Sequence, residues 1–400
     1  MKVTVADKLP DKAIEDLKKL GAEVEFNPSA KAADLEKGLG ETQVLIVRST
    51  VVSAETIQNS PNLALIIRAG AGVNNIDLEA ASSMGVYVAN CPGKNSIAVA
   101  ELAMGLILAL DRYLPDNVAD FRSGNWNKAA YSKADGLFGK TLGVIGTGQI
   151  GQEVIRRARG FGMPVVAWSR SLTPERAEEM EIEYAGSVED VASRCDILSV
   201  HLASTPQTQG IISAEVLSKL KDGAFFINTA RAEVVDEDAL YEEVKSGRIR
   251  AGLDVFSEEP EYKQGDVESR FQELEGAYIS HHIGASTQQA QFAVAADAVD
   301  IVRGYLEEGR VRNWLNRRKH SDEGWKLVVR HFDKPGVLAN VMSDLKQADI
   351  NIQDMENVIF DGKKTACATI ELDAEPPSST LKNIQGRQDE VISAVLINSH

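Results

Sequence analysis

The chain has 400 residues, 44% of them hydrophobic, and a formal net charge of −16 from 43 basic and 59 acidic residues. This composition fits two or three folded domains rather than a disordered chain. The acidic balance argues against nonspecific binding to nucleic acid or to an anionic membrane. The three cysteines, Cys91, Cys195 and Cys367, show neither even pairing nor a metal-ligand spacing. We therefore expect reduced thiols in a cytoplasmic protein.

From the first residue to about residue 90, short apolar strands alternate with helical segments. Strands are predicted at 3–6, 24–26, 44–48, 64–68 and 86–90, and helices at 11–20, from 32, at 53–58 and at 76–83. Such alternation predicts a parallel sheet covered by helices on both faces. An apolar helix at 97–110, too short to span a bilayer, leads to a second series of the same kind. Its strands are predicted at 142–145, 164–168, 196–200, 224–228, 250–254 and 278–281.

A glycine-rich segment at the first strand of the second series is the most informative part of the chain. The buried strand 142–145 is followed by Gly-Thr-Gly-Gln-Ile-Gly at 146–151 and by a helix over 149–160. In this pattern Gly146 makes a tight turn, Gly148 lets the backbone approach a pyrophosphate, and Gly151 lets the helix pack on the strand. The amides at the helix N-terminus, where Gln149 and Ile150 lie, would hold the diphosphate. The strand–helix context favours a dinucleotide site over an ordinary glycine-rich turn.

The last third of the chain changes pattern. We expect a long helix at 287–308 to return to the first domain, and a polar linker at 316–324 to follow. Strands at 327–331, 350–359, 365–372 and 391–398, with helices at 335–347 and 379–384, spell a ferredoxin-like βαββαβ unit. The predicted fold is α/β, with two doubly wound, Rossmann-like parallel sheets and this third domain. The predicted domains are a substrate-binding domain (1–94 with 283–315), a dinucleotide-binding domain (95–282) and a C-terminal domain (325–400).

Several segments resemble those of a known family. The run Asn-Thr-Ala-Arg-Ala-Glu from residue 228, Ala-Gly-Leu-Asp-Val-Phe-Ser-Glu-Glu-Pro at 251–260 and His-His-Ile-Gly-Ala-Ser-Thr at 281–287 resemble signature segments of D-isomer-specific 2-hydroxyacid dehydrogenases. The tail, with Asp-Lys-Pro-Gly at 333–336 and Asp-Ile-Asn-Ile at 349–352, resembles an ACT regulatory domain. The resemblance implies hydride transfer between a nicotinamide cofactor and a small D-2-hydroxy acid. The combined layout implies 3-phosphoglycerate as the substrate, in the first step of serine synthesis.

The family pattern, carried over by position, implies a catalytic set. Arg231 matches the arginine that binds the substrate carboxylate and polarises the carbonyl. Glu259 matches the carboxylate that orients a histidine, and His282 matches that histidine. His281 stands where the family usually has proline, and we assign it no proton-transfer role. These residue types suit the reaction, because histidine exchanges a proton near neutrality and an arginine fork matches a carboxylate.

Substrate contacts are expected mainly from the first domain. The loop at 68–74 resembles the family loop whose backbone amides, at Ala71 and Gly72, receive the substrate carboxylate. Arg48 and Ser49 end a strand and resemble a phosphate-proximal corner, and Asn95 lies in a segment resembling the interdomain hinge. An ordinary helix cap or an interdomain ion pair is the alternative for the strand-end arginines, Arg48 and Arg68.

The remaining cofactor contacts also follow the family pattern. They are His201, Thr205, Pro206, Thr229, Ala230, Asp254, His282 and Gly284. For Asp254, the alternative to a cofactor contact is a purely structural role. At the end of the second strand NAD enzymes usually carry an acidic residue for the ribose, but this chain has Ser169 and Arg170. Local chemistry therefore leans toward NADP and the family resemblance toward NAD, and both stay open. No cluster has metal-ligand spacing, so we predict no metal.

In the tail, His331, Asp333 and Asn351 resemble the effector-binding positions of ACT domains that bind serine. Asp333 replaces the usual asparagine, and a plain folding or dimerising module is an equal alternative. An effector of this kind requires tails of two subunits to meet, so we expect a homo-oligomer, a dimer or a tetramer. Two other functions remain open. One is a glyoxylate or hydroxypyruvate reductase with an ACT tail, and the other is a nucleotide-sensing interaction protein.

Overall fold

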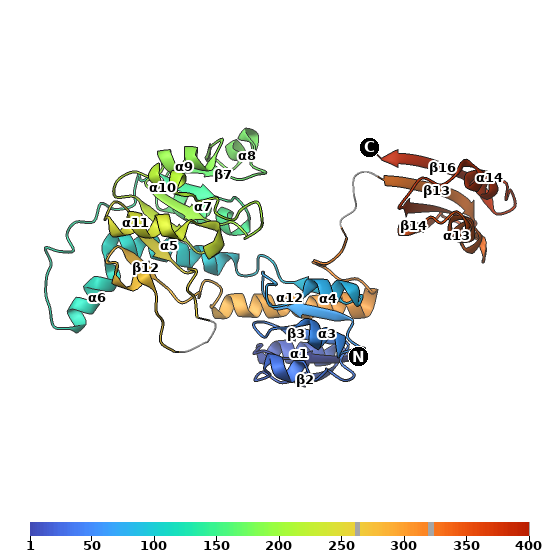
Figure 1. Ribbon diagram of the computed structural model, residues 1–400, viewed down its shortest axis with the longest axis horizontal. Coiled ribbons are helices and arrows are strands. Elements are labelled where there is room, and N and C mark those ends of the chain that lie inside the picture. Colours follow the sequence, from blue (N-terminus) through green and yellow to red (C-terminus); the bar gives the residue numbers. More distant parts are fainter. Residues whose placement is uncertain (261–264, 319–323, 400) are drawn as a thin grey trace. The chain divides into compact units, whose positions relative to one another are not determined.

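The computed structural model describes residues 1–260, 265–318 and 324–399. The chain separates into two compact units, Met1–Asn316 and Arg317–His400 (Figure 1). The middle of the predicted linker, at 319–323, lies outside the described residues. In the described part of the chain, no helix combines the length and apolarity needed to cross a membrane.

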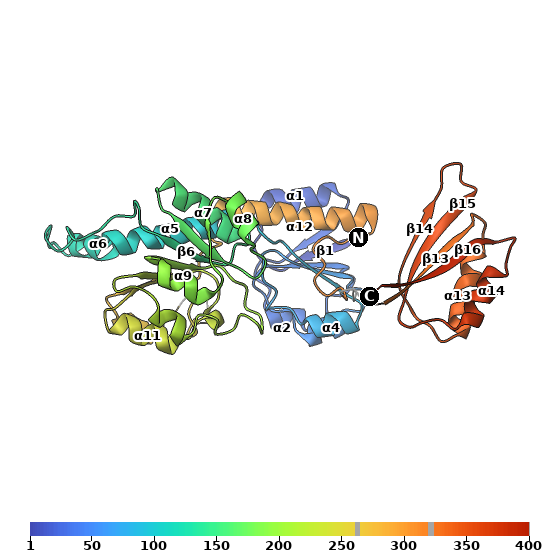
Figure 2. The ribbon, with the colours of Figure 1, turned by 90° about the horizontal axis from the view of Figure 1, so that it is seen from above.

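The first sheet of the larger unit has five parallel strands in the order β2-β1-β3-β4-β5. The strands are β1 (Lys2–Val5), β2 (Glu23–Phe26), β3 (Val44–Val47), β4 (Leu65–Arg68) and β5 (Tyr87–Asn90). One face carries α1 (Asp11–Lys19) and α12 (Gln288–Glu308), and the other carries α2 (Ala32–Leu35), α3 (Ala54–Gln58) and α4 (Leu78–Ser83) (Figure 2). All four residues of β3 are buried, as expected for a parallel strand covered on both faces.

The second sheet has seven parallel strands in the order β12-β11-β10-β9-β6-β7-β8. The strands are β6 (Leu142–Ile145), β7 (Val165–Trp168), β8 (Glu183–Tyr184), β9 (Ile197–Val200), β10 (Phe225–Asn228), β11 (Arg250–Leu253) and β12 (Ala277–Ile279). The order reverses at β6, and ligands of such sheets bind at this kind of switch point.

Helices cover both faces of the second sheet (Figure 2). One face carries α5 (Ser96–Arg112), α7 (Gln149–Gly160) and α8 (Pro174–Glu179), and the other carries α9 (Val188–Arg194), α10 (Ala214–Ser218) and α11 (Glu237–Lys245). Two short 3₁₀ helices, η1 (Ala232–Val234) and η2 (Arg270–Glu273), lie in the loops after β10 and β11. The sequence missed α6 (Leu114–Arg122), because that helix buries none of its residues and so has no core-facing apolar pattern.

The C-terminal unit is an antiparallel sheet in the order β14-β15-β13-β16. Its strands are β13 (Gly324–Phe332), β14 (Ile352–Ile359), β15 (Thr365–Leu372) and β16 (Val391–Ser399), and its helices are α13 (Val337–Gln347) and α14 (Ser378–Gln385). Both helices contribute to the single apolar core of this unit, and both lie on the same side of the sheet (Figure 2). The predicted fold class, two Rossmann-like sheets and a βαββαβ unit, is confirmed.

Candidate active site

The glycine-rich turn between β6 and α7 has the shape that a dinucleotide requires. Gly146 has φ of 98°, and a side chain there would meet the carbonyl oxygen of His201 at 2.5 Å. A side chain at Gly151 would collide with the carbonyl of Gly146, so the close approach of helix and strand needs this glycine. At Gly148 an added side chain would meet no atom within 4 Å. The turn thus leaves open space at the N-terminus of α7, which has no side-chain cap.

Two predicted cofactor residues present buried polar atoms that no described residue satisfies. They are Nδ1 of His201 and Oγ1 of Thr229. The other ring nitrogen of His201 lies 2.8 Å from the hydroxyl of Ser199, and burial lowers the pKa of His201 to about 4. The imidazole is therefore neutral at pH 7. His201 follows β9 and Thr229 follows β10, so both lie at the carboxyl ends of neighbouring strands. Unsatisfied buried polar atoms are costly, so their presence there fits a ligand with its own polar groups.

The end of β7 carries no acidic side chain. Ser169 shares a hydrogen bond of 2.8 Å with the hydroxyl of Thr147. Arg170 is exposed and forms no ion pair with any described residue. The structure therefore places the exposed guanidinium of Arg170, rather than a carboxylate, directly after Ser169 at the end of β7.

A cavity of about 590 Å³ brings residues of both halves of the larger unit together. The first half contributes Arg48, Ser49, Arg68 and Gly72, and the second contributes Arg231, Glu259 and His282. A second cavity of about 170 Å³ shares Arg48, Arg68 and His282 with the first and is also lined by Asn95. The predicted catalytic set and most of the predicted substrate contacts therefore line these two neighbouring cavities.

His282 and Glu259 form a hydrogen-bonded pair in this cavity. Nδ1 of His282 lies 2.7 Å from Oε2 of Glu259, and Oε1 of Glu259 accepts from the backbone amide of Phe256 at 3.1 Å. The hydrogen bond from Glu259 raises the pKa of His282 above its usual value, and this outweighs the opposing effect of burial. His282 has φ of 49°, a left-handed conformation that residues other than glycine adopt rarely. The surrounding contacts must therefore hold the backbone of His282 in place.

Asp254 supplies part of that support. Its carboxylate is almost fully buried and accepts from the amides of Ile283 and Gly284, both at 2.8 Å, and from the hydroxyl of Ser280 at 2.6 Å. The amide of His282 donates to the Asp254 carbonyl at 3.0 Å. Both oxygens of the side chain are thus engaged with the loop that carries His282. These contacts fit the structural role that the sequence analysis gave as the alternative for Asp254, and a cofactor contact of Asp254 stays a prediction.

Two asparagines that the sequence analysis did not single out organise the opposite walls. Asn228 ends β10, where its side chain donates to the carbonyl of Arg231 and accepts from the amide of Ala230, both at 2.9 Å. Asn90 ends β5 and donates to the carbonyl of Ala71. A guanidinium nitrogen of Arg231 lies 3.1 Å from where a side chain at Gly72 would begin, so glycine leaves room for Arg231 beside the backbone of this loop. A polar residue directly after a buried strand was the available signal for both asparagines.

Three arginines of the cavity lack acidic partners. No carboxylate of the described residues lies within 4.0 Å of the guanidinium groups of Arg48, Arg68 or Arg231. Nε of Arg68 is buried without a hydrogen bond. Burial, followed by the charges of Arg231 and Arg48, lowers the pKa of Arg68. Glu237 also lines the cavity, but its carboxylate accepts from the amide of Ser257 at 2.9 Å. Glu233 and Glu259 line the cavity as well. The site therefore offers an anionic ligand three guanidinium groups that have no ion-pair partner among the described residues.

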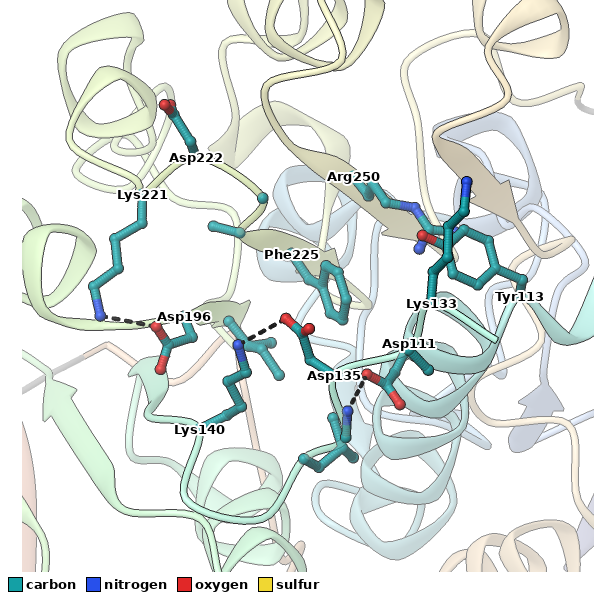
Figure 3. A pocket seen from close by; sticks show the side chains of 16 residues that line it. Asp111, Tyr113, Lys133, Asp135, Lys140, Asp196, Lys221, Asp222, Phe225 and Arg250 are labelled. Atoms are coloured by element: carbon teal, nitrogen blue, oxygen red, sulfur yellow. Dashed lines mark hydrogen bonds and ion pairs between the residues drawn. The ribbon is translucent and has the colours of Figure 1, made fainter. Parts of the chain in front are cut away.

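A further cavity, of about 260 Å³, lies at the amino-terminal ends of strands of the second sheet, away from these residues (Figure 3). Two of its four basic side chains form ion pairs, Lys140 with Asp135 at 3.0 Å and Lys221 with Asp196 at 2.8 Å. None of the predicted site residues lines it. No cluster of His, Cys, Asp or Glu among the described residues has the geometry of a metal site.

The C-terminal unit keeps two of its predicted effector residues apart. His331 is buried at the end of β13, where Nε2 lies 3.1 Å from Oδ1 of Asn357. His331 pairs with Ala366 on β15, whereas Ile352, next to Asn351, pairs with Leu372. Six residues of β15 separate these positions, which corresponds to about 20 Å along the strand. The amide of Asp333, close to His331, donates to the carbonyl of Lys364 at 3.0 Å. Within one chain, His331 and Asn351 therefore do not form one pocket.

Comparison with known proteins agrees with the fold. The profile of the D-isomer specific 2-hydroxyacid dehydrogenase NAD binding domain matches residues 104–284. The chain is 40% identical over 353 residues to D-3-phosphoglycerate dehydrogenase of Methanocaldococcus jannaschii, a match covering 88% of this chain and 66% of that protein. It is 42% identical over 272 residues to hydroxypyruvate reductase of Thermotoga maritima, covering 67% of this chain and 86% of that protein.

A solved structure of a related enzyme has the same fold as the larger part of this chain. The NAD⁺-bound 3-phosphoglycerate dehydrogenase of Entamoeba histolytica superimposes with a TM-score of 0.65 at 26% identity, covering 80% of this chain and 99% of that one. The chain belongs to the D-isomer specific 2-hydroxyacid dehydrogenase family, which confirms the resemblance found in the sequence. It spans about two thirds of the length of the phosphoglycerate dehydrogenase it matches.

Proposed function

We propose that the protein is a nicotinamide-dependent dehydrogenase that interconverts 3-phosphoglycerate and 3-phosphohydroxypyruvate. The observation that carries this proposal is the cavity in which the Glu259–His282 pair faces three arginines without acidic partners. A 2-hydroxy acid with one carboxylate needs one such arginine. A substrate with a second anionic group at its other end provides an anionic partner for the remaining two arginines. The guanidinium groups without ion-pair partners therefore favour a phosphorylated acid over glycolate or glycerate.

The residues of the chain divide the chemical work. Arg231 binds the substrate carboxylate beside the backbone of Gly72 and polarises the reacting C–O bond. His282, with Nδ1 held by Glu259, uses its free Nε2 to take the hydroxyl proton during oxidation and to return it during reduction. Glu259 fixes the tautomer and stabilises the imidazolium. The glycine turn, the N-terminus of α7, His201 and Thr229 would hold a dinucleotide, whose nicotinamide accepts or donates the hydride.

The substrate and the cofactor are tested together by steady-state kinetics with both nucleotides. We expect the highest kcat/KM with 3-phosphoglycerate or its keto acid. Higher values for glyoxylate or hydroxypyruvate would identify the reductase instead, an alternative that the name of the Thermotoga maritima relative supports. No turnover of any acid would favour a nucleotide-sensing interaction protein. Arg170 and the lack of a carboxylate beside Ser169 favour NADP, and the NAD binding domain of the family favours NAD.

Replacement of Glu259 by glutamine is expected to lower kcat and to move the pH profile. Glu259 raises the pKa of His282, so its loss lowers that pKa. Oxidation requires neutral His282, and its rate rises as pH passes through the pKa of His282. The acid limb of the oxidation profile should therefore move to lower pH in Glu259→Gln. Glu258→Gln, which changes the neighbouring carboxylate, is the control. An unmoved limb in the Glu259 variant would contradict the pairing.

We further propose that the enzyme acts in the cytoplasm as a homo-oligomer and that its tail binds an amino acid. Because His331 and Asn351 lie at opposite ends of one sheet, a shared effector site would have to combine His331 and Asp333 of one subunit with Asn351 of another. Such a site makes ligand binding depend on how subunits meet.

Truncation from residue 321 onward should leave the dehydrogenase measurably active but remove inhibition by serine or glycine. The division of the chain at residue 316 and the separate apolar core of the tail are the physical basis. The measurement is the initial rate of both proteins across a millimolar panel of amino acids. If the full-length enzyme is equally insensitive to every member of the panel, the tail is only a folding or dimerising module.

A further inference from the structure

Asp7 organises the phosphate-side corner of the cavity through the backbone. It follows β1 and is only 6% exposed. One oxygen, Oδ2, accepts from three consecutive amides, those of Arg48 at 2.7 Å and of Ser49 and Thr50 at 2.9 Å. The other oxygen accepts from the hydroxyl of Ser49 at 3.0 Å. Successive amides that converge in this way form an anion-binding concavity, which the protein here fills with its own carboxylate.

The carboxylate of Asp7 is charged at neutral pH. Burial alone raises its pKa, but the hydrogen bonds from Arg48, Thr50 and Ser49 together outweigh burial and place the pKa below its usual range. Because Asp7 uses these three amides and the Ser49 hydroxyl, none of them is left to donate to an incoming anion. The side chain of Arg48 remains as the donor of this corner, and it lines both cavities.

A similar arrangement, a buried carboxylate that accepts from consecutive backbone amides, lies on the other side of the cavity. Asp254, also buried after a strand of its sheet, holds the loop of His282 through two consecutive amides and one hydroxyl. Each carboxylate therefore fixes a loop that brings a functional side chain to the same space, Arg48 in one case and His282 in the other. Each also acts on a charge of the site, since Asp7 partly offsets the lowering of the pKa of Arg68 by burial and Asp254 contributes to the raised pKa of His282.

We propose that Asp7 is a positioning residue that sets the preference of the enzyme for phosphorylated substrates, by holding the 48–50 corner so that Arg48 faces the second anionic group. This inference rests on the proposed function. Two effects of Asp7 have opposite signs. As a negative charge near three arginines it weakens anion binding, whereas as the anchor of the corner it strengthens binding of the phosphate end.

The two effects are separated by Asp7→Asn and Asp7→Glu, assayed with 3-phosphohydroxypyruvate and with hydroxypyruvate. If position dominates, both variants raise KM for the phosphorylated acid by about fivefold or more, while KM for hydroxypyruvate and kcat change less than about twofold. If charge dominates, Asp7→Asn lowers both KM values, Asp7→Glu resembles the wild type, and the proposal is wrong. Asp77→Asn is the matched control, because Asp77 also accepts from a backbone amide, that of Ala80 at 2.9 Å, outside the cavity.

Two readouts keep the result independent of folding and of the proposed function. The cofactor dissociation constant, measured by fluorescence titration, must equal that of the wild type in every variant compared. If the wild type prefers the phosphorylated acid and both Asp7 variants keep that preference, the role of Asp7 is overturned and the proposed function stands. If the wild type has no such preference, the proposed function fails, and the role of Asp7 falls with it.

Discussion

His282→Asn is expected to lower kcat by about 10²–10⁴-fold without weakening cofactor binding, because asparagine cannot exchange a proton at neutral pH. Asparagine suits the test, since it tolerates the left-handed backbone at this position (φ of 49°) better than alanine does. The loop should therefore keep its shape. The measurements are single-turnover rates and a titration with the reduced nucleotide.

His281→Asn is the control for this variant, because His281 is the neighbouring histidine and has no assigned role in proton transfer. Comparable losses in the two variants would mean that the loop has been disturbed rather than the proton acceptor removed. A kcat of His282→Asn within tenfold of the wild type would assign the proton transfer to another group.

Arg231→Ala is expected to lower kcat/KM on the order of a hundredfold with every substrate tested, which corresponds to a loss of about 3 kcal/mol of transition-state stabilisation. The substrate carboxylate loses its bidentate partner, and the carbonyl loses a nearby positive charge. The loss should appear with phosphorylated and unphosphorylated acids alike, which distinguishes Arg231 from Arg48. Arg303→Ala, on the exposed side of α12, is the control for the loss of one arginine. Near wild-type activity of Arg231→Ala would mean that the active site lies elsewhere.

The elements that the sequence predicted best are those whose burial gives a regular pattern. All four residues of β6 are buried, and β15 alternates strictly between its two faces. Both strands begin and end at the predicted residues. The two-residue β8 and the exposed α6 bury nothing that a pattern could reveal. Local sequence therefore predicts an element to the extent that packing constrains it.

The same distinction applies to the site. Arg231, Glu259 and His282 lie in recognisable motifs, and they line one cavity. Their assigned roles stay predictions until the variants are measured. The residues that hold the cavity walls act on distant backbone, as when Asp7 binds amides 41 to 43 positions later in the chain. No local period encodes such contacts, because they arise only when the parallel strands β1 and β3 become neighbours.

The helix α12 has a consequence for the order in which the chain folds. Residues of α12, among them Val294, Ala298 and Val302, complete the core on one face of the sheet that ends with β5 at Asn90. At about 5–20 residues per second, a ribosome needs about 10 to 40 s to proceed from Asn90 to Glu308, the end of α12. During this interval the nascent first sheet lacks part of its apolar cover. The second sheet is continuous in the chain, so we expect it to fold first during synthesis, with the N-terminal segment completed only when α12 emerges.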